Sequence, residues 1–162
     1  MLSKFISKED CASCRFCCSF RRCSLWETPI FTRENLEELP ESVCLNTFED
    51  ENMIYGTYDL SSKYTTQDSE EEVPCPFLNP DTGCTLNAKA KPWDCSIWPL
   101  RVMKKDNSTV IALTPTCPTM NKTNIDELRE YVNTNLREDL IEYANSHPYL
   151  IKEYHEGFII IR

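Results

Sequence analysis

The most regular pattern of apolar and polar positions lies near the end of the chain, between residues 124 and 146. Its apolar residues recur every three or four positions, a spacing that returns them to one face of an α-helix. Asn124 precedes the pattern, Glu127 lies in its first turn and His147-Pro148 follows it, as in a capped and terminated helix. We therefore expect a long amphipathic helix over 124–146 that packs one face on the core. The residues of that face are Ile125, Leu128, Val132, Leu136, Leu140 and Ala144.

Other segments have the composition of β-strands. Residues 100–104 and 108–114 flank a short polar stretch at 105–107 and predict a hairpin, although its turn contains no glycine. The apolar run 157–162 predicts a terminal strand, and residues 53–58 also have strand character. Together these elements predict a small α+β domain in which the long C-terminal helix packs on a small antiparallel sheet.

The more polar stretches give weaker signals. Thr32 is a candidate N-cap for a short helix that ends at Pro40. Residues 46–73 are acidic and mostly irregular outside 53–58, and the run Ser-Glu-Glu-Glu at 69–72 is typical of a solvated loop. The chain has no internal repeat and no linker long enough to separate domains, so its length predicts one domain over residues 1–162.

Candidate chemistry is concentrated in ten cysteines. The densest group is Cys11-Ala-Ser-Cys14-Arg-Phe-Cys17-Cys18, with the spacing C-x2-C-x2-C-C. If this segment is helical, Cys14, Cys17 and Cys18 share one face. A second, widely spaced group consists of Cys75, Cys84, Cys95 and Cys117.

Thiolates in this number indicate a soft metal. They select zinc, copper(I) or iron–sulfur clusters over magnesium and calcium. Zinc sites of the finger or ribbon type usually combine two C-x2-C pairs, whereas only the first group here contains close pairs. The overlapping C-x2-C-x2-C is similar to the run that binds a 4Fe–4S cluster in bacterial ferredoxins, where a remote cysteine completes a cluster. The spacing favours an iron–sulfur cluster, and zinc is the alternative. We expect the cysteine loops to form a metal-organised lobe of the α+β domain.

Composition and charge restrict the setting of this chemistry. The N-terminus has no apolar run of signal-peptide length, and no window reaches the length of a membrane span. We therefore expect a cytoplasmic protein without a membrane partner, whose reduced cysteines serve metal ligation or redox chemistry rather than disulfides. A net charge of -9 disfavours nucleic-acid binding, and only three glycines exclude a glycine-rich phosphate loop. A protein partner or redox partner is easier to accommodate.

The surroundings of the second cysteine group carry a family resemblance. Four short sequence motifs follow the cysteine-rich start. In chain order they are Cys75-Pro-Phe-Leu, Gly83-Cys84-Thr-Leu, Lys91-Pro-Trp-Asp-Cys95-Ser-Ile-Trp-Pro99 and Cys117-Pro118. This arrangement resembles the CxxCxxCC family, also called the YkgJ family, which is described as a zinc- or iron-chelating domain and includes the cysteine-rich region of flagellin lysine N-methylase. The resemblance covers about residues 11 to 118.

The resemblance implies eight metal ligands, and two cysteines lie outside its pattern. Cys23 and Cys44 are expected to be small buried hydrophobes or accessory thiols. The family usually has Arg-Pro before its third downstream cysteine and an arginine just after it, whereas this chain has Lys91-Pro92 and Ser96. Because lysine cannot form the bidentate contacts of arginine, an anion contact there is in doubt. The implied ligands are Cys11, Cys14, Cys17, Cys18, Cys75, Cys84, Cys95 and Cys117.

Residues near the cysteines have plainer expected roles. Trp93, Trp98 and Phe77 are expected to form a hydrophobic shell around the metal. Asp94 is expected to be an exposed carboxylate. His147 and His155 are expected to be surface residues rather than ligands. Eight thiolates exceed what one zinc ion or one 4Fe–4S cluster needs, so either two four-cysteine sites or one site with spare thiols is possible, and the sequence does not assign cysteines to centres.

Three functions follow from these observations. The first is an iron–sulfur protein that transfers electrons or assists a protein-modification reaction. The methylase resemblance raises protein lysine methylation, but that enzyme is much longer than this chain, and family likeness alone does not grant activity. The second is a structural zinc protein that acts as an interaction module, and the third is a metal chelator or carrier. Whether the chain catalyses a reaction is left open at this stage.

Overall fold

The computed structural model describes residues 2, 4–50 and 53–162. Backbone contacts divide the chain into two compact units, each of which is described by itself. Unit 1 comprises residues 1–10 and 97–162, and unit 2 comprises residues 11–96. Both contain short helices and small, mostly antiparallel sheets, so the expected mixture of helix and antiparallel sheet is confirmed. Within the described residues, no helix is both long and apolar enough to span a bilayer.

Unit 1 is built on a hairpin at the predicted place. Strand β8 (Leu100–Lys105) pairs antiparallel with β9 (Ser108–Leu113) through the two-residue turn Asp106-Asn107. Asp106 takes the turn with a φ of 53°, a left-handed conformation that aspartate adopts more readily than most residues other than glycine. The turn therefore forms without the glycine that usually marks it.

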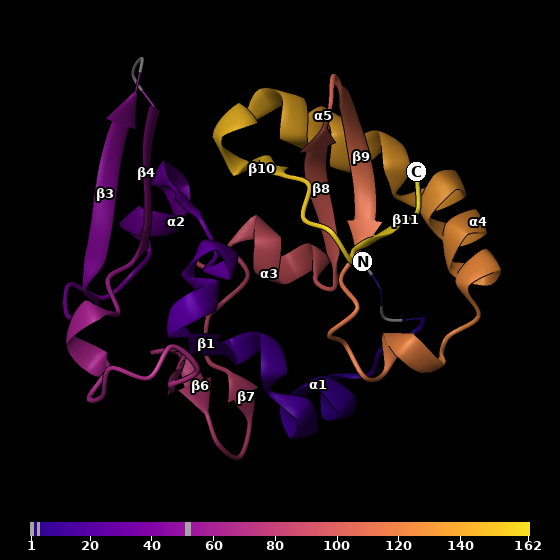
Figure 1. Ribbon diagram of the computed structural model, residues 1–162. Coiled ribbons are helices and arrows are strands. Elements are labelled where there is room, and N and C mark those ends of the chain that lie inside the picture. Colours follow the sequence, from indigo (N-terminus) through magenta and orange to yellow (C-terminus); the bar gives the residue numbers. More distant parts are fainter. Residues whose placement is uncertain (1, 3, 51–52) are drawn as a thin grey trace. The chain divides into compact units, whose positions relative to one another are not determined.

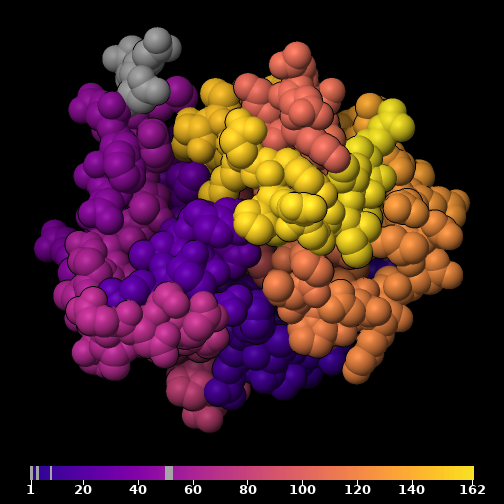
Figure 2. Space-filling model, in the orientation of Figure 1, coloured from indigo at the N-terminus to yellow at the C-terminus, as the bar shows by residue number. Residues whose placement is uncertain are grey.

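Short edge strands complete this sheet in the order β10-β8-β9-β11. The predicted terminal strand is confirmed as β11 (Ile159–Ile160), which pairs antiparallel with β9. On the other edge, β10 (Lys152–Glu153) pairs parallel with β8, so the sheet is not purely antiparallel as expected. Parallel neighbours need a long connection, and residues 106–151, which include β9, join β8 to β10. Figure 2 draws the C-terminal residues in yellow, and they lie on the surface of unit 1 that faces the viewer.

Two helices occupy the place of the predicted long helix. They are α4 (Ile125–Asn135) and α5 (Arg137–Ser146), separated at Leu136, whose φ of -124° is not helical. The predicted single helix over 124–146 is therefore wrong in its continuity. At the end of α4, the Asn135 side-chain amide donates to the carbonyl oxygen of Tyr131 at 3.0 Å.

The predicted start and apolar face of this region are confirmed. The Asn124 side chain accepts hydrogen bonds from the backbone N–H groups of Asp126 and Glu127, at 2.9 and 3.3 Å. Both helices lie along the sheet of unit 1 in Figure 1, and they turn the predicted face inward across the break. The buried residues of that face are Leu128, Val132, Leu136, Leu140 and Ala144.

Unit 2 contains a second sheet, with strand order β2-β4-β3. Its central strand β4 (Met53–Tyr58) confirms the predicted strand, and β2 (Phe31–Thr32) pairs with it. The other neighbour, β3 (Leu45–Asp50), lies partly in a stretch that was expected to be irregular. Its sequence Leu-Asn-Thr-Phe-Glu-Asp has little apolar alternation, so pairing with β4 rather than local pattern makes it a strand.

The short helix after β2 forms as the sequence predicts. Helix α2 (Arg33–Glu37) begins after Thr32, whose side chain caps the backbone N–H of Asn35 while the Asn35 side chain accepts from the Thr32 N–H. This reciprocal pair satisfies two backbone donors at the helix start. The Asn35 amide also donates to the carbonyl oxygen of Lys89 at 2.7 Å, which holds the segment before Cys95 against this helix.

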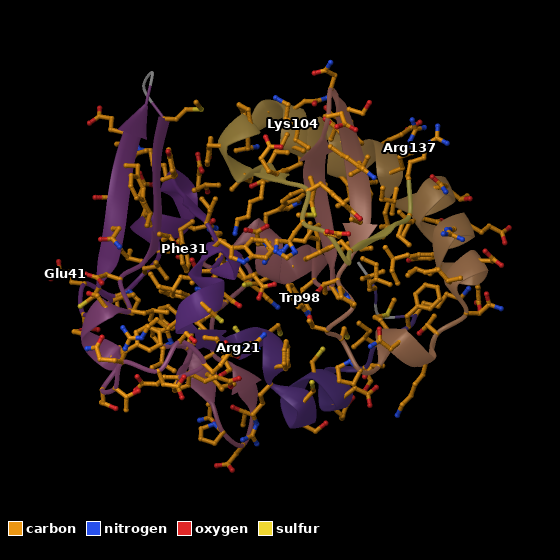
Figure 3. All side chains as sticks on the ribbon, viewed as in Figure 1. Arg21, Phe31, Glu41, Trp98, Lys104 and Arg137 are labelled. Atoms are coloured by element: carbon orange, nitrogen blue, oxygen red, sulfur yellow. The ribbon has the colours of Figure 1, made fainter. Side chains whose placement is uncertain are left out.

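The core of unit 2 is aromatic. The rings of Phe31 and Tyr58 meet edge to face with centroids 5.0 Å apart, and Phe20 lies 5.8 Å from Tyr58. Phe31 is labelled in Figure 3, where it lies inside this unit. Leu60 and Val73 complete the buried cluster.

The remaining elements are short. Two helices cross the boundary between the units: α1 (Lys8–Cys14) begins in unit 1 and continues into unit 2, and α3 (Trp93–Ile97) begins in unit 2 and ends in unit 1. Unit 2 also contains η1 (Phe16–Cys18), β1 (Ser19–Arg21), η2 (Arg22–Glu27), η3 (Ser61–Lys63), β5 (Glu72–Pro74), β6 (Leu78–Asn79) and β7 (Gly83–Cys84). Unit 1 also contains η4 (Met120–Lys122) and η5 (Pro148–Leu150).

Candidate metal centre

The N-terminal cysteines lie on two separate short helices. Helix α1 ends at Cys14, and Arg15 then takes a left-handed conformation with a φ of 56° before the 3-10 turn η1. The Arg15 side chain stabilises this bend by donating to the carbonyl oxygens of Ala12 and Pro80. The expectation that Cys14 shares a helical face with Cys17 and Cys18 is therefore wrong, because the helix does not continue through Arg15.

A strand pair brings the first cysteine group to the second. Strand β1 pairs antiparallel with β5, with Ser19 opposite Pro74. This register places Cys18 and Cys75 next to each other, and the Cys75 N–H donates to the Cys18 carbonyl oxygen at 2.7 Å. Two cysteines that are 57 positions apart in the sequence are thus joined through backbone hydrogen bonding.

A small hairpin adds Cys84. Strands β6 and β7 pair antiparallel with Leu78 opposite Cys84, and the Leu78 N–H donates to the Cys75 carbonyl oxygen at 3.0 Å. Gly83 has a φ of +81°, and a Cβ there would lie 3.5 Å from the Cβ of Ala12. The hairpin therefore also approaches α1 between Cys11 and Cys14.

Cys95 lies in α3, beside a carboxylate that the sequence placed at the surface. Asp94 is only 3% exposed, and its Oδ2 accepts a hydrogen bond from the Ile30 N–H at 3.3 Å. The expectation of an exposed Asp94 is wrong, because the carboxylate ties α3 to the segment that leads into β2. Its role is to hold the Cys95 segment in place.

Tyr58 lies at the centre of these segments. Its hydroxyl oxygen is 3.4 Å from the Cys75 Sγ, within hydrogen-bonding distance for sulfur. Burial raises the pKa of Tyr58 above its ordinary value, and the negative charges of the Cys75, Cys95 and Cys84 thiolates raise it further. These effects keep the Tyr58 hydroxyl protonated.

The thiols around Tyr58 are partly buried and influence one another. Cys17 Sγ and Cys18 Sγ are 3.9 Å apart. The contact with Cys17 and, next, burial raise the pKa of Cys18, while Lys91 lowers it. Burial likewise raises the pKa of Cys75, opposed by the hydrogen bond from Tyr58. A bound cation stabilises the charged thiolate form of such groups.

Seven of the eight implied ligands belong to unit 2. Four of them are linked to one another by the contacts above, and one of these, Cys75, contacts Tyr58; the four are Cys17, Cys18, Cys75 and Cys84. Cys11 and Cys14 flank Ala12 beside the β6–β7 hairpin. Cys117 belongs to unit 1, and its participation stays a prediction.

The donor set fits a metal that prefers thiolates. No disulfide joins cysteines in the described part of the chain, so sulfur atoms are available as donors. Within the same residues, however, no three histidine, cysteine or carboxylate side chains converge as tightly as a bound ion requires. The metal-organised lobe itself stays a prediction.

The two cysteines outside the family pattern are exposed. Cys44 lies at the surface, and so does Cys23, whose Sγ is 3.1 Å from Glu70 Oε1. The alternative that they are small buried hydrophobes is therefore wrong. Both lie in unit 2, so they provide controls for the cysteines around Tyr58.

The expected shell residues belong to different units. Trp93 is buried in unit 2 beside Cys95, and the Phe77 ring centroid is 6.4 Å from that of Tyr58. Trp98 lies in unit 1, where the Arg101 guanidinium stacks over its ring at 5.2 Å. Of the two histidines, His155 is exposed, as predicted, and His147 is half-buried and stacks on the Tyr143 ring with centroids 4.1 Å apart.

Glu71 is a residue whose role the sequence did not reveal. The run 69–72 was expected to be a solvated loop, yet the Glu71 carboxylate accepts hydrogen bonds from the backbone and side chains of both Thr65 and Thr66. Arg22 pairs with it at 3.2 Å. These hydrogen bonds lower the pKa of Glu71 and fix the loop that leads into β5. The pair Thr65-Thr66 was the available signal, but a contact across five residues has no helical or strand period.

Comparison with known proteins gives no match: no protein-family model, curated protein or solved structure is similar to this chain.

Proposed function

We propose that unit 2 is a metal-binding domain in which cysteine thiolates hold an iron–sulfur cluster. The observation that carries the proposal is that backbone pairing brings Cys18 and Cys84 to the segment of Cys75, whose Sγ contacts the buried Tyr58 hydroxyl. Several thiols from segments distant in the sequence serve mainly disulfides or metal ligation, and none of these three cysteines forms a disulfide.

Three features support a soft-metal site, and the first and third of them favour an iron–sulfur cluster. The overlapping spacing from Cys11 to Cys17 is similar to cluster-binding runs, and the resemblance to the CxxCxxCC family supports a zinc- or iron-chelating domain. Aromatic residues also surround the thiols, with Phe77 close to Tyr58 and Trp93 buried beside Cys95. Such surroundings limit solvent access and tune a cluster's reduction potential.

The chain's own residues hold and orient the centre in this proposal. The β1–β5 pair fixes Cys18 relative to Cys75, and the β6–β7 hairpin fixes Cys84. Asp94 anchors the segment that carries Cys95. When bound, a cluster of this kind supplies one-electron redox chemistry. We therefore propose a role in electron transfer to a protein partner, or in support of a protein-modification reaction such as lysine methylation, in the cytoplasm.

Zinc is the second candidate, and one distance favours it. A tetrahedral zinc–thiolate site with zinc–sulfur bonds of about 2.3 Å has sulfur atoms about 3.8 Å apart. The separation of 3.9 Å between Cys17 Sγ and Cys18 Sγ is close to this value. In that case the metal is structural, and the domain serves as an interaction module or a metal carrier.

Anaerobic purification of the full chain, followed by a visible spectrum and analysis of metal and acid-labile sulfide, tests the proposal. An iron–sulfur protein is brown, contains iron and sulfide, and loses visible absorbance on reduction with dithionite. Colourless protein with stoichiometric zinc selects the second candidate. Protein that binds neither metal, even after supply of iron with sulfide or of zinc under reducing conditions, contradicts both.

A further inference from the structure

Tyr58 contacts the proposed metal ligands through a single polar atom. The hydroxyl oxygen lies 3.4 Å from Cys75 Sγ, and the side chain is 4% exposed. A buried hydroxyl almost always has a hydrogen-bond partner, and here that partner is a sulfur atom. The contact is therefore a structural feature of the site rather than a chance surface approach.

The ring of Tyr58 is fixed by aromatic neighbours from three segments. Phe31 in β2 meets it at 5.0 Å with planes at 72°, Phe20 in β1 lies at 5.8 Å, and Phe77 after Cys75 lies at 6.4 Å. Packing from several directions leaves the ring little freedom. The hydroxyl is thereby aimed at Cys75 by contacts that do not involve the hydroxyl itself.

The direction of the hydrogen bond follows from ligation. A cysteine binds metal as a thiolate, which has no proton and can only accept. The Tyr58 O–H must then donate to Cys75 Sγ. A donor to a ligating sulfur draws electron density from it, and hydrogen bonds to ligands both orient them and tune the metal.

We propose that Tyr58 is a positioning residue of the metal centre, whose hydroxyl donates a hydrogen bond to the Cys75 thiolate and so sets the electronic character and retention of the metal. This inference rests on the proposed function, since it requires Cys75 to be a ligand. It extends that function by assigning a role to a residue outside the proposed set of cysteine ligands.

The test compares Tyr58→Phe with Tyr64→Phe in the full chain. Tyr58→Phe keeps the ring and removes the donor. Tyr64 is a matched control, because it is a partly buried tyrosine of the same unit whose hydroxyl donates to the Phe20 carbonyl oxygen at 2.8 Å. Either substitution deletes one buried hydrogen bond, but only Tyr58→Phe deletes a hydrogen bond to sulfur.

Each protein is studied with the metal that the wild type binds. Reconstituted with ferrous iron and sulfide, Tyr58→Phe is expected to hold as much iron as the wild type and to have a more negative reduction potential, because the reduced, more negatively charged cluster loses a donor. Loaded with Zn²⁺ instead, it is expected to bind the ion about 10-fold or more weakly in competition with a chromophoric chelator. Tyr64→Phe is expected to match the wild type in both readouts.

The outcomes separate this inference from the proposed function. A wild-type protein that takes up neither metal refutes the proposed function and this inference with it. A wild type that binds metal while Tyr58→Phe has an unchanged potential or zinc affinity refutes the inference alone. Equal changes in Tyr58→Phe and Tyr64→Phe also refute it, because they indicate a general loosening of unit 2 rather than an effect at Cys75.

Discussion

Replacement of Phe31 by alanine is expected to destabilise unit 2 severely. Phe31 is 0% exposed, and truncation of a buried phenylalanine costs about 3–5 kcal/mol. Its edge-to-face contact with Tyr58, at 5.0 Å and 72°, is worth about 0.5–1.5 kcal/mol beyond burial and places the expected loss near the upper end. Domains of this size are stable by only about 5–15 kcal/mol, so the substitution removes a large part of the total.

Urea unfolding followed by far-UV circular dichroism measures this loss. With a loss of about 5 kcal/mol and a slope of about 2 kcal/mol per molar urea, the midpoint should fall by about 2.5 M. Phe48→Ala is the control, because Phe48 lies in the same sheet, is 47% exposed and stacks on Tyr55 at 5.3 Å. Its loss should be about 1 kcal/mol or less. Equal midpoints for the two variants would refute the view that the rings around Tyr58 form the core of this unit.

Two further predictions concern local structure. Asn124→Ala should lower the free energy of unfolding by about 1 kcal/mol, because it removes the acceptor for two backbone N–H groups at the start of α4. The control Asn133→Ala, within the same helix, should be neutral or stabilising. Thermal melts that show Asn133→Ala to be less stable than Asn124→Ala contradict the cap assignment. Hydrogen bonds lower the pKa of Glu71 in the folded protein below its ordinary value of 4.5. The ionised carboxylate therefore makes its whole contribution to the free energy of unfolding above about pH 4.5, and this contribution is lost as the pH falls through the pKa of Glu71 in the folded protein. Glu71→Gln should therefore be less stable than the wild type at neutral pH, and the gap in urea midpoint should narrow on acidification; a gap that is the same at pH 7 and about pH 3 contradicts this role for Glu71.

Local pattern predicted the elements that depend on neighbouring residues. The face from Leu128 to Ala144 was found because its period survives the break at Leu136. The hairpin at Asp106-Asn107 and the cap at Thr32 were likewise visible in short stretches of sequence. The break itself was not predicted, because a conformational change at one residue leaves the three-four spacing intact.

Features that depend on distant residues were not visible in the sequence. Strand β3 forms through its pairing with β4, and Asp94 is buried because Ile30, 64 positions away, donates to it. The cysteine spacing identified candidate ligands, but the bend at Arg15 is stabilised by Pro80, 65 positions away. The contact of Tyr58 with Cys75 likewise joins residues 17 positions apart. Nothing in the periodicity of residues 53–58 distinguishes Tyr58 from an ordinary core tyrosine.

The most direct test of the central claim is the metal content per chain of four single cysteine variants, measured by elemental analysis after anaerobic purification. Cys18→Ser and Cys75→Ser alter partly buried thiols in the group around Tyr58, whereas Cys23→Ser and Cys44→Ser alter exposed thiols of the same unit. The metal-centre account predicts that the first two lose most of the wild-type metal and that the last two retain it. Folded Cys75→Ser protein with full wild-type metal content would contradict the account.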